Sequence, residues 1–184
     1  GGPAGDLPIA RAASPDNAAL RFDPVAGLFG LGFNRPAGWL EQALRASPHH
    51  TVVLDADALT LIAGSTALHA ALLARSGARV LTPHPLEAAR MLGVDANSVQ
   101  ADRVAAGMAL SERFGAWTVL KGAGTVVVSP DGQWRINGSG NAGLATAGTG
   151  DVLAGMLGAL LAQGLRPEHA VPGAGWLHGA AAHH

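Results

Sequence analysis

Short apolar runs and helical patterns alternate along most of the chain. The strand candidates are runs of β-branched and other apolar residues that stop at a glycine, a proline or a polar residue. The helix candidates repeat apolar side chains every three or four positions. The pattern predicts strands over residues 51–55, 79–82, 117–120, 125–129 and 133–136. It predicts helices over residues 39–46, 66–76, 86–92, 98–114, 149–163 and 168–182.

This order of elements predicts an α/β fold with three layers. Strands that alternate with helices form a mostly parallel central sheet with helices on both faces. The turn Pro130-Asp131-Gly132 separates the last two strands and predicts a hairpin. Residues 1–24 are rich in Gly, Pro, Ala and Asp without periodicity, so we interpret them as a loop or the remnant of an incomplete N-terminal part. Residues 25–184 are predicted to form the ligand-binding domain.

Composition and charge exclude several classes of protein. Hydrophobic residues make up 48% of the chain and charged residues 14%, which is typical of a folded chain and not of a disordered one. The net charge of −1 and the lack of a basic stripe argue against nucleic acid as a partner. The absence of cysteine excludes disulfides and thiolate catalysis. It is compatible with the cytoplasm, where we expect the protein.

The sequence also argues against a membrane span and a protein-bound metal. The apolar run Val152–Ala162 is too short to cross a bilayer. The first residues lack the basic start and apolar core of a signal peptide. Five histidines show no zinc-ligand spacing, so we expect them at the surface or in packing roles: His49, His50, His69, His169 and His178.

The glycine-rich segment from Asn137 to Met156 is the most informative part of the sequence. Its glycines, among them Gly148 and Gly150, free the backbone to take positive φ and to approach a ligand closely. The N–H groups of such a loop and of the helix predicted to follow it form a phosphate site. Asp151, in the first turn of that helix, is either a cap or dipole partner, or a base for a hydroxyl that attacks phosphorus. The glycine density favours the base.

Two other loops at the ends of predicted strands carry candidate binding residues. Lys121 begins a loop that offers a nucleotide one cation, several N–H groups and a hydroxyl. The rest of this loop is Gly122, Ala123, Gly124 and Thr125. The alternative is a tight turn with an exposed lysine. His84, held between two prolines, is a candidate for substrate binding, and a structural role is its alternative.

Asp55 and Asp57 stand at the end of a further predicted strand. Two carboxylates at this spacing are able to hold water or Mg²⁺. We favour the simpler interpretation, in which Asp57 caps a helix.

These segments, in this order, resemble the ADP-dependent (S)-NAD(P)H-hydrate dehydratase family of the ribokinase-like superfamily. The matching motifs are Leu54-Asp-Ala-Asp-Ala-Leu59, Leu81-Thr-Pro-His-Pro85 with Glu87, Leu120-Lys-Gly-Ala-Gly-Thr125, Gly140–Gly155 with Gly148-Thr-Gly-Asp151, and Trp176-Leu-His-Gly179. The resemblance covers about residues 25–182. It implies a three-layer ribokinase-like fold that lacks N-terminal elements of the family.

The resemblance implies a repair enzyme that dehydrates hydrated NADH or NADPH at the expense of ADP and yields AMP and phosphate. The implied contacts to AMP come from Lys121, Gly122, Ala123, Gly124, Thr125 and Gly150. The implied contacts to the hydrated cofactor come from Gly32, His84 and Asp151. We expect Asp151 to be the catalytic residue, Mg²⁺ to accompany ADP, and the protein to be a homo-oligomer such as a tetramer.

The chain departs from the family pattern in three ways, and one is that residues 1–24 do not supply the Gly/Ala-rich strand–helix unit with which the family contacts the hydrate. It has Leu28-Phe-Gly-Leu-Gly32 where the family has Gly-Pro-Gly-Leu-Gly, and Leu86 where many members have glycine. Two other functions stay open: a ribokinase-like kinase for a vitamin-precursor alcohol, and a degenerate domain that binds adenine nucleotides without turnover. The Lys-Gly-Ala-Gly-Thr and Thr-Pro-His-Pro loops argue against the kinase.

Overall fold

The computed structural model describes residues 22–23, 27–28, 37–139 and 148–181. Its centre is a five-stranded sheet in the order β3-β4-β5-β6-β7. The strands are β3 (Val52–Leu54), β4 (Arg79–Leu81), β5 (Trp117–Leu120), β6 (Val126–Val128) and β7 (Trp134–Ile136). The first three are parallel, and β6 and β7 add an antiparallel hairpin. All five lie where the hydrophobic pattern predicted strands.

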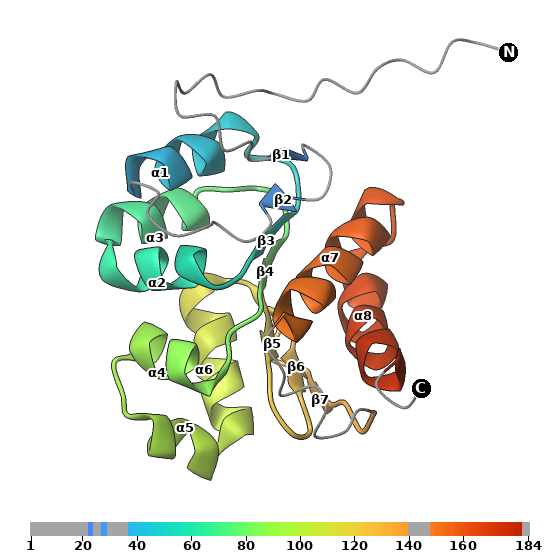
Figure 1. Ribbon diagram of the computed structural model, residues 1–184. Helices are drawn as coiled ribbons and strands as arrows, with labels where there is room; N and C mark the ends of the chain where they lie inside the picture. The colour runs from blue at the N-terminus through green and yellow to red at the C-terminus, as the bar shows by residue number, and fades with distance from the viewer. Residues whose placement is uncertain (1–21, 24–26, 29–36, 140–147, 182–184) are drawn as a thin grey trace, which may run out of the picture.

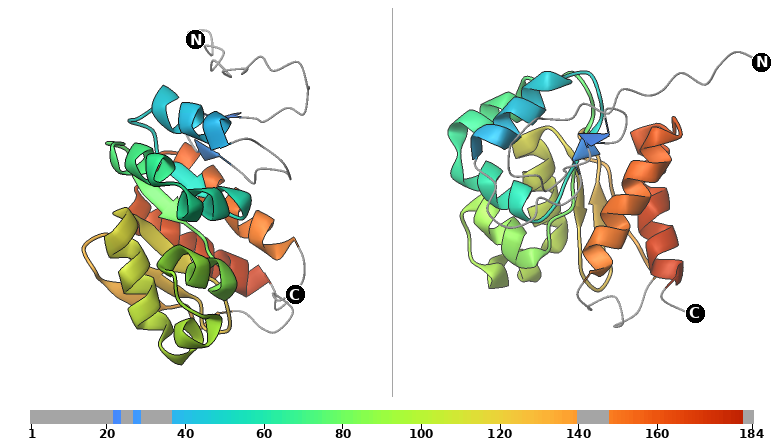
Figure 2. Two further views of the ribbon diagram at one scale, coloured as in Figure 1. Left: turned by 90° about the vertical axis from the view of Figure 1, so that its left-hand side faces the viewer. Right: turned by 45° about the horizontal axis from the view of Figure 1, so that its top comes forward.

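Helices cover both faces of the sheet (Figures 1 and 2). On one face, α7 (Thr149–Ala162) and α8 (Pro167–Ala181) pack against each other. The other face carries α1 (Ala37–Ala46), α2 (Asp57–Gly64), α3 (Thr66–Leu73), α4 (Pro85–Leu92), α5 (Ala96–Ala101) and α6 (Arg103–Phe114). This arrangement confirms the predicted three-layer α/β/α class.

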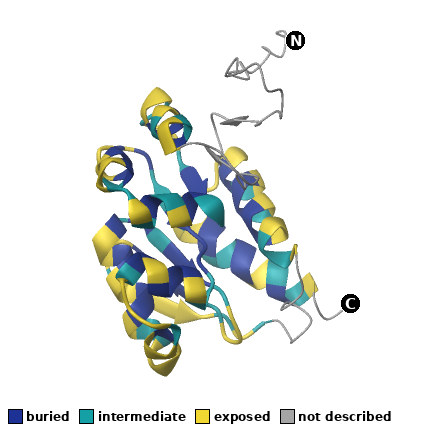
Figure 3. Ribbon diagram, turned by 60° about the vertical axis from the view of Figure 1, so that its left-hand side comes forward, coloured by how far each residue is buried: buried dark blue, intermediate teal, exposed yellow. Residues whose placement is uncertain are grey.

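The side chains of the central strands alternate between two apolar cores. In β3, Val52 and Leu54 pack with α1 to α6, whereas Val53 between them packs with α7 and α8. Val80 of β4 and Val119 of β5 join the second core. Figure 3 shows the consequence: the central strands and the inward sides of the helices are buried, and the outward sides are exposed. Burial on both faces explains why these strands read as uninterrupted apolar runs.

The single helix predicted over residues 98–114 is wrong, because the structure has two helices there. α5 ends at Ala101 and α6 begins at Arg103. Asp102 lies between them with φ −143° and ψ 87°, and its carboxylate accepts a hydrogen bond from the N–H of Ala105. A local cap therefore interrupts a pattern whose helical periodicity continues.

The helix α2 was not predicted, although Ala58, Leu59 and Ile62 form its buried side. Its first residue is Asp57, and Ala56 before it is the N-cap, so the interpretation of Asp57 as a cap is wrong. Ala56 has φ 52° and ψ −120°, a backbone conformation that is costly for a residue with a Cβ.

Two further strands precede α1. β1 (Phe22–Asp23) and β2 (Gly27–Leu28) form an antiparallel pair. The rest of residues 1–24 lies outside the described residues, and so does Gly32. Within residues 37–139 and 148–181, the helices are all too short or too polar to cross a membrane.

Candidate functional site

Three of the segments chosen from the sequence meet at one edge of the sheet. The parallel strands β3, β4 and β5 end side by side, and Asp55, His84 and Lys121 follow these ends. A main-chain hydrogen bond joins two of the loops, because the N–H of Lys121 donates to the carbonyl of Pro83 at 2.9 Å. The carboxyl edge of a parallel sheet is the usual place for a ligand in an α/β protein.

Lys121 forms an ion pair with Asp55 at this edge. The Nζ of Lys121 lies 2.8 Å from Oδ1 of Asp55. The Asp55 side chain is 4% exposed and the Lys121 side chain 21% exposed, so the carboxylate is buried and the ammonium is largely covered. A buried carboxylate is stable only with such a partner. The alternative of an exposed lysine in a tight turn is therefore wrong.

Gly150 brings the glycine-rich segment onto this ion pair. A Cβ atom on Gly150 would lie 3.2 Å from Nζ of Lys121 and 3.6 Å from Oδ2 of Asp55. The first turn of α7 therefore packs directly against the two charged groups. An added methyl group would crowd the ammonium and displace it by a few tenths of an ångström.

Asp151 lies in the first turn of α7 and is exposed. The N-cap of α7 is Gly148, which has φ 89° and no side chain to cap with. The interpretation of Asp151 as the cap is therefore wrong, and a favourable interaction with the helix dipole remains. The start of a helix carries N–H groups without partners inside the helix, and the exposed Asp151 places a carboxylate beside them.

Two glycines shape the loop that follows Lys121. Gly122 has φ 144° and Gly124 has φ 65°, which are conformations that favour glycine. The hydroxyl of Thr125 donates to the carbonyl of Gly122 at 3.1 Å and closes the loop on itself. The residues between Lys121 and Thr125 are exposed, so their main chain is accessible to a ligand.

Arg103, the first residue of α6, binds main-chain carbonyls of the same loop. Its guanidinium donates to the carbonyls of Leu120 at 3.0 Å and Lys121 at 3.1 Å, and to the carbonyl of Ala123. Burial lowers the pKa of this guanidinium. The sequence around Arg103 does not indicate this role, because the partners of Arg103 lie 17 to 20 residues away and the residue falls inside a predicted helix.

His84 is the N-cap of α4. Its ring Nδ1 accepts hydrogen bonds from the N–H groups of Leu86 at 3.1 Å and Glu87 at 3.3 Å, and Glu87 accepts from the N–H of His84 at 2.8 Å. Because Nδ1 accepts, the neutral ring carries its hydrogen on Nε2. The side chain is 43% exposed, which leaves it accessible to a ligand. The structural role left open by the sequence is present, and substrate binding stays a prediction.

Both ends of the glycine-rich segment are attached to α8. At its start, Asn137 and Ser139 donate side-chain hydrogen bonds to main-chain carbonyls of α8 at 2.7 Å and 3.0 Å. Where the segment enters α7, Nε2 of His178 donates to the carbonyl of Thr149 at 2.8 Å. A Cβ atom on Gly179 would clash with Ser139, so the contact requires glycine. His178 thus has the packing role that was predicted for it.

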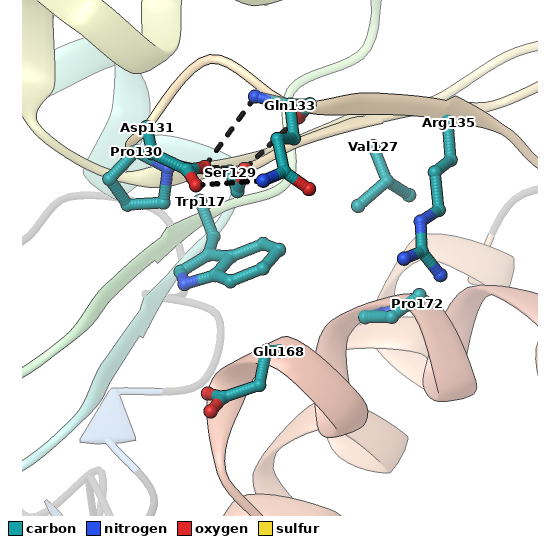
Figure 4. Close-up of a pocket in the computed structure, with 9 residues that line it drawn as sticks. All are labelled: Trp117, Val127, Ser129, Pro130, Asp131, Gln133, Arg135, Glu168 and Pro172. Carbon is teal, nitrogen blue, oxygen red and sulfur yellow. Dashed lines mark hydrogen bonds between the residues drawn. The ribbon is translucent and has the colours of Figure 1, made fainter.

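A cavity of about 380 Å³ lies at the opposite end of β5 (Figure 4). Its walls are Trp117 at the start of β5, the turn between β6 and β7, and Glu168 and Pro172 of α8. In Figure 4, Arg135 reaches from β7 toward Pro172. The loops that carry Asp55, His84 and Lys121 do not line it. The candidate site is therefore the open edge at the carboxyl ends of the strands and not this cavity.

The sequence of the chain is similar to those of known NAD(P)H-hydrate dehydratases. The sequence model of the NAD(P)H-hydrate dehydratase family matches residues 15–184. The ADP-dependent (S)-NAD(P)H-hydrate dehydratase of Neisseria meningitidis serogroup B is 52% identical over 171 residues, which are 91% of this chain and 57% of that protein. The bifunctional NAD(P)H-hydrate repair enzyme of Gloeobacter violaceus is 48% identical over 161 residues, 88% of this chain and 30% of that protein. The chain therefore spans 57% of the length of the first relative and 30% of the length of the second.

Solved structures agree with the sequences. The ADP/ATP-dependent NAD(P)H-hydrate dehydratase of Bacillus subtilis, co-crystallised with ATP and Mg²⁺, has a TM-score of 0.62 and 40% identity, with 71% of this chain and 44% of that chain covered. A ribokinase-like superfamily protein of Enterococcus faecalis V583 has a TM-score of 0.65 and 27% identity, with 82% and 51% covered. These likenesses confirm the ribokinase-like fold. Together with the family model, which matches most of the residues, they show that the chain belongs to the NAD(P)H-hydrate dehydratase family.

Proposed function

We propose that the chain catalyses the ADP-dependent dehydration of hydrated NADH and NADPH, which restores the working cofactor and yields AMP and phosphate. The observation that supports this most directly is the packing of Gly150 on the Lys121–Asp55 ion pair. It puts the expected nucleotide loop beside the helix start that carries Asp151. The relatives with similar sequences are named for the same reaction.

ADP binds, in this proposal, across the loop Lys121–Thr125 and the start of α7. Lys121 supplies the cation for a phosphate, and Asp55 holds that cation at the sheet edge. The N–H groups of the loop and the hydroxyl of Thr125 contact the nucleotide. Gly150 brings the first turn of α7 close to Lys121, so that the ammonium and the N–H groups of α7 face the same phosphate.

The hydrated cofactor contacts His84 and Asp151. His84 lies at the neighbouring strand end, linked to Lys121 through the hydrogen bond between Lys121 and Pro83. Its partly exposed side chain offers the substrate the N–H donor at Nε2, which lies 3.5 Å from Oε1 of Glu87. A contact from Gly32 is proposed from the family motif alone, since Gly32 lies outside the described residues.

The chemistry uses Asp151 as the base. Its carboxylate accepts the proton of the hydrate's hydroxyl group while that oxygen attacks the terminal phosphorus of ADP. The bond from this phosphorus to the bridging oxygen breaks, and AMP leaves. The N–H groups at the start of α7 stabilise the charge that develops on the phosphoryl oxygens. The electron pair of the ring nitrogen then expels phosphate from the carbon, and loss of a proton from the neighbouring carbon restores the double bond.

Mg²⁺ accompanies ADP in this proposal. Across the described ranges, no three His, Asp or Glu side chains gather to hold a metal ion by themselves. Asp55 is paired with Lys121, whereas the exposed carboxylate of Asp151 stands at the phosphate-binding end of α7. This donor set fits an ion held largely by phosphate oxygens and water, with Asp151 as the carboxylate that faces it. When bound, such an ion neutralises phosphate charge.

We also propose that the protein is a cytoplasmic homo-oligomer, such as a tetramer. Support for an oligomer comes from large apolar side chains exposed on the outer helix layer, namely Val152, Trp176 and Leu177. A second copy would remove this apolar surface from water. Light scattering of the purified chain measures the mass of the assembly.

The reaction is tested by incubating the chain with NADH hydrate, ADP and Mg²⁺. Recovery of the NADH absorbance band, together with equal amounts of AMP and phosphate, is the expected result. A phosphorylated vitamin-precursor alcohol formed from ATP, with no NADH recovered, would favour the kinase. Binding of ADP without any product would favour a non-catalytic domain. Either of these two results contradicts the proposal.

A further inference from the structure

Arg103 points to a further role in the nucleotide site, and this role rests on the proposed function. Arginine side chains usually bind carboxylates or phosphates. Arg103 is different, because its guanidinium donates to three main-chain carbonyls of one loop, those of Leu120, Lys121 and Ala123. It also stands at the first position of α6, where a positive charge is unfavourable to the helix dipole. Arg103 therefore does not stabilise its own helix through its charge, and its guanidinium acts on the loop instead.

We infer that Arg103 is the positioning residue of the nucleotide loop, which it holds with the N–H groups of Gly122 and Gly124 directed at the phosphate groups of ADP. The geometry of the peptide unit carries the argument. In a trans peptide the C=O and the N–H point in opposite directions. The carbonyl of Lys121 shares its peptide unit with the N–H of Gly122, and the carbonyl of Ala123 with the N–H of Gly124. Because Arg103 binds both carbonyls, both N–H groups point away from the guanidinium.

These two N–H groups are available to a ligand. No described residue accepts a hydrogen bond from either of them, and both glycines are exposed. Both N–H groups point to the same side of the loop because the carbonyls of their peptide units both face the guanidinium, and the positive φ values of 144° and 65° favour glycine at these positions. Such an arrangement binds anions. Arg103 therefore fixes the loop in its binding conformation before the nucleotide arrives.

Two details show that the chain is built around this contact. A Cβ atom on Gly122 would lie 2.7 Å from Nη2 of Arg103, so the loop and the guanidinium fit only with glycine at this position. Asp102 ends the run of α5 and caps α6, which places Arg103 at the turn where it reaches the loop. The break between the two helices, unexpected from the sequence, thus serves the position of Arg103.

The test compares Arg103→Met and Arg103→Lys with the wild type in calorimetric titrations with ADP. Arg103→Met is expected to weaken ADP binding about 10- to 100-fold, the effect of losing charge-assisted hydrogen bonds. In turnover, the KM for ADP rises by the same factor, while kcat and the KM for the hydrate change by less than about threefold. Arg103→Lys keeps the charge but lacks the planar fork, so it recovers only part of the affinity.

Arg113→Met is the matched control, since Arg113 is an exposed arginine at the other end of the same helix. It should bind ADP like the wild type. Unchanged ADP affinity in Arg103→Met would overturn the inference. Full recovery of ADP affinity in Arg103→Lys would also contradict it, because any positive charge at this position would then be sufficient. A wild type that binds ADP without dehydrating NADH hydrate would overturn the proposed reaction but not the role of Arg103. A wild type that fails to bind ADP would overturn both.

Discussion

The Nζ of Lys121 lies 2.8 Å from Oδ1 of Asp55, so the cation expected to meet a phosphate is already held by a buried carboxylate. Either residue therefore affects the fold as well as the ligand. Replacing only one partner changes stability and ligand binding together, because the other charge is left buried without a partner.

We predict that Lys121→Met lowers the free energy of unfolding by about 3 kcal/mol, because it strands the Asp55 carboxylate in the interior. ADP affinity should fall about 10- to 100-fold. The double variant Lys121→Met/Asp55→Asn should recover most of the stability and none of the affinity. Urea unfolding and calorimetric titration of the three proteins measure both quantities. If the double variant regains ADP affinity, Lys121 does not bind the nucleotide.

We predict that Gly150→Ala keeps the fold and lowers kcat/KM for ADP about 10- to 100-fold. The added Cβ would sit 3.2 Å from the Lys121 ammonium, and a small displacement of a positioned group costs this much. Gly155→Ala in the same helix is the control, because a Cβ there meets nothing within 4 Å. That control should be more stable by about 1 kcal/mol with unchanged activity. Equal activities of the two variants would argue against a nucleotide site beside Gly150.

We predict that His84→Ala and His84→Asn differ in stability and agree in activity. His84→Ala removes the cap of α4 and should cost about 1 kcal/mol, whereas asparagine is a good cap and should restore most of it. Both variants lack the imidazole, so both should raise the KM for the hydrate and leave ADP affinity unchanged. Thermal melting and steady-state kinetics measure the two effects. A normal KM in His84→Asn would leave His84 with its capping role alone.

We predict that Ala56→Gly raises the free energy of unfolding by about 1 kcal/mol. The conformation of Ala56, with φ 52° and ψ −120°, strains a residue with a Cβ by about 1–3 kcal/mol, and the extra freedom of glycine in the unfolded chain offsets part of the gain. Ala63→Gly, within α2, should instead destabilise by about 1 kcal/mol. Thermal melting of Ala56→Gly and Ala63→Gly measures the two changes in stability. A loss of stability in both variants would mean that Ala56 is unstrained.

We predict that Asp151→Asn lowers turnover by about 10²–10⁴-fold, the usual contribution of a positioned base. Because Gly148 and not Asp151 is the N-cap of α7, the melting temperature should change little. ADP affinity should hold or rise, since a negative charge beside the phosphates is removed. Turnover of NADH hydrate with ADP is the measurement. A folded Asp151→Asn protein with near-normal turnover would end the proposed mechanism.

The sequence predicted the strands and their end loops well because burial leaves a direct record in the residues. Val52 to Leu54 are apolar without interruption since both faces of β3 are covered, and Lys121 stands out as a charge directly after such a run. Positions that depend on contacts across the fold leave no such record. The three hydrogen bonds of Arg103 join residues far apart in the chain, and the residue types next to Arg103 do not indicate them.

Local alternatives were also hard to resolve from residue types alone. Asp57, Asp102 and Asp151 all precede or begin helical stretches, and any of them fits the pattern of a cap. Only Asp102 is one, because the path of the backbone makes Ala56 and Gly148 the cap residues of α2 and α7. The capping histidine of α4 escaped notice since histidine is not among the usual N-cap residues.

The ion pair between Asp55 and Lys121 joins residues that are 66 positions apart, and Gly150, which packs on it, comes from still later in the chain. No short fragment contains all three. The site therefore exists only once the central strands and α7 have assembled, and unfolding destroys it as a whole. A nucleotide that binds there is in effect a folding ligand: at a concentration about 100 times its Kd it adds about 2.7 kcal/mol to the free energy of unfolding. Cellular ADP would then protect the chain from unfolding and, with it, from the proteases that act on unfolded chains.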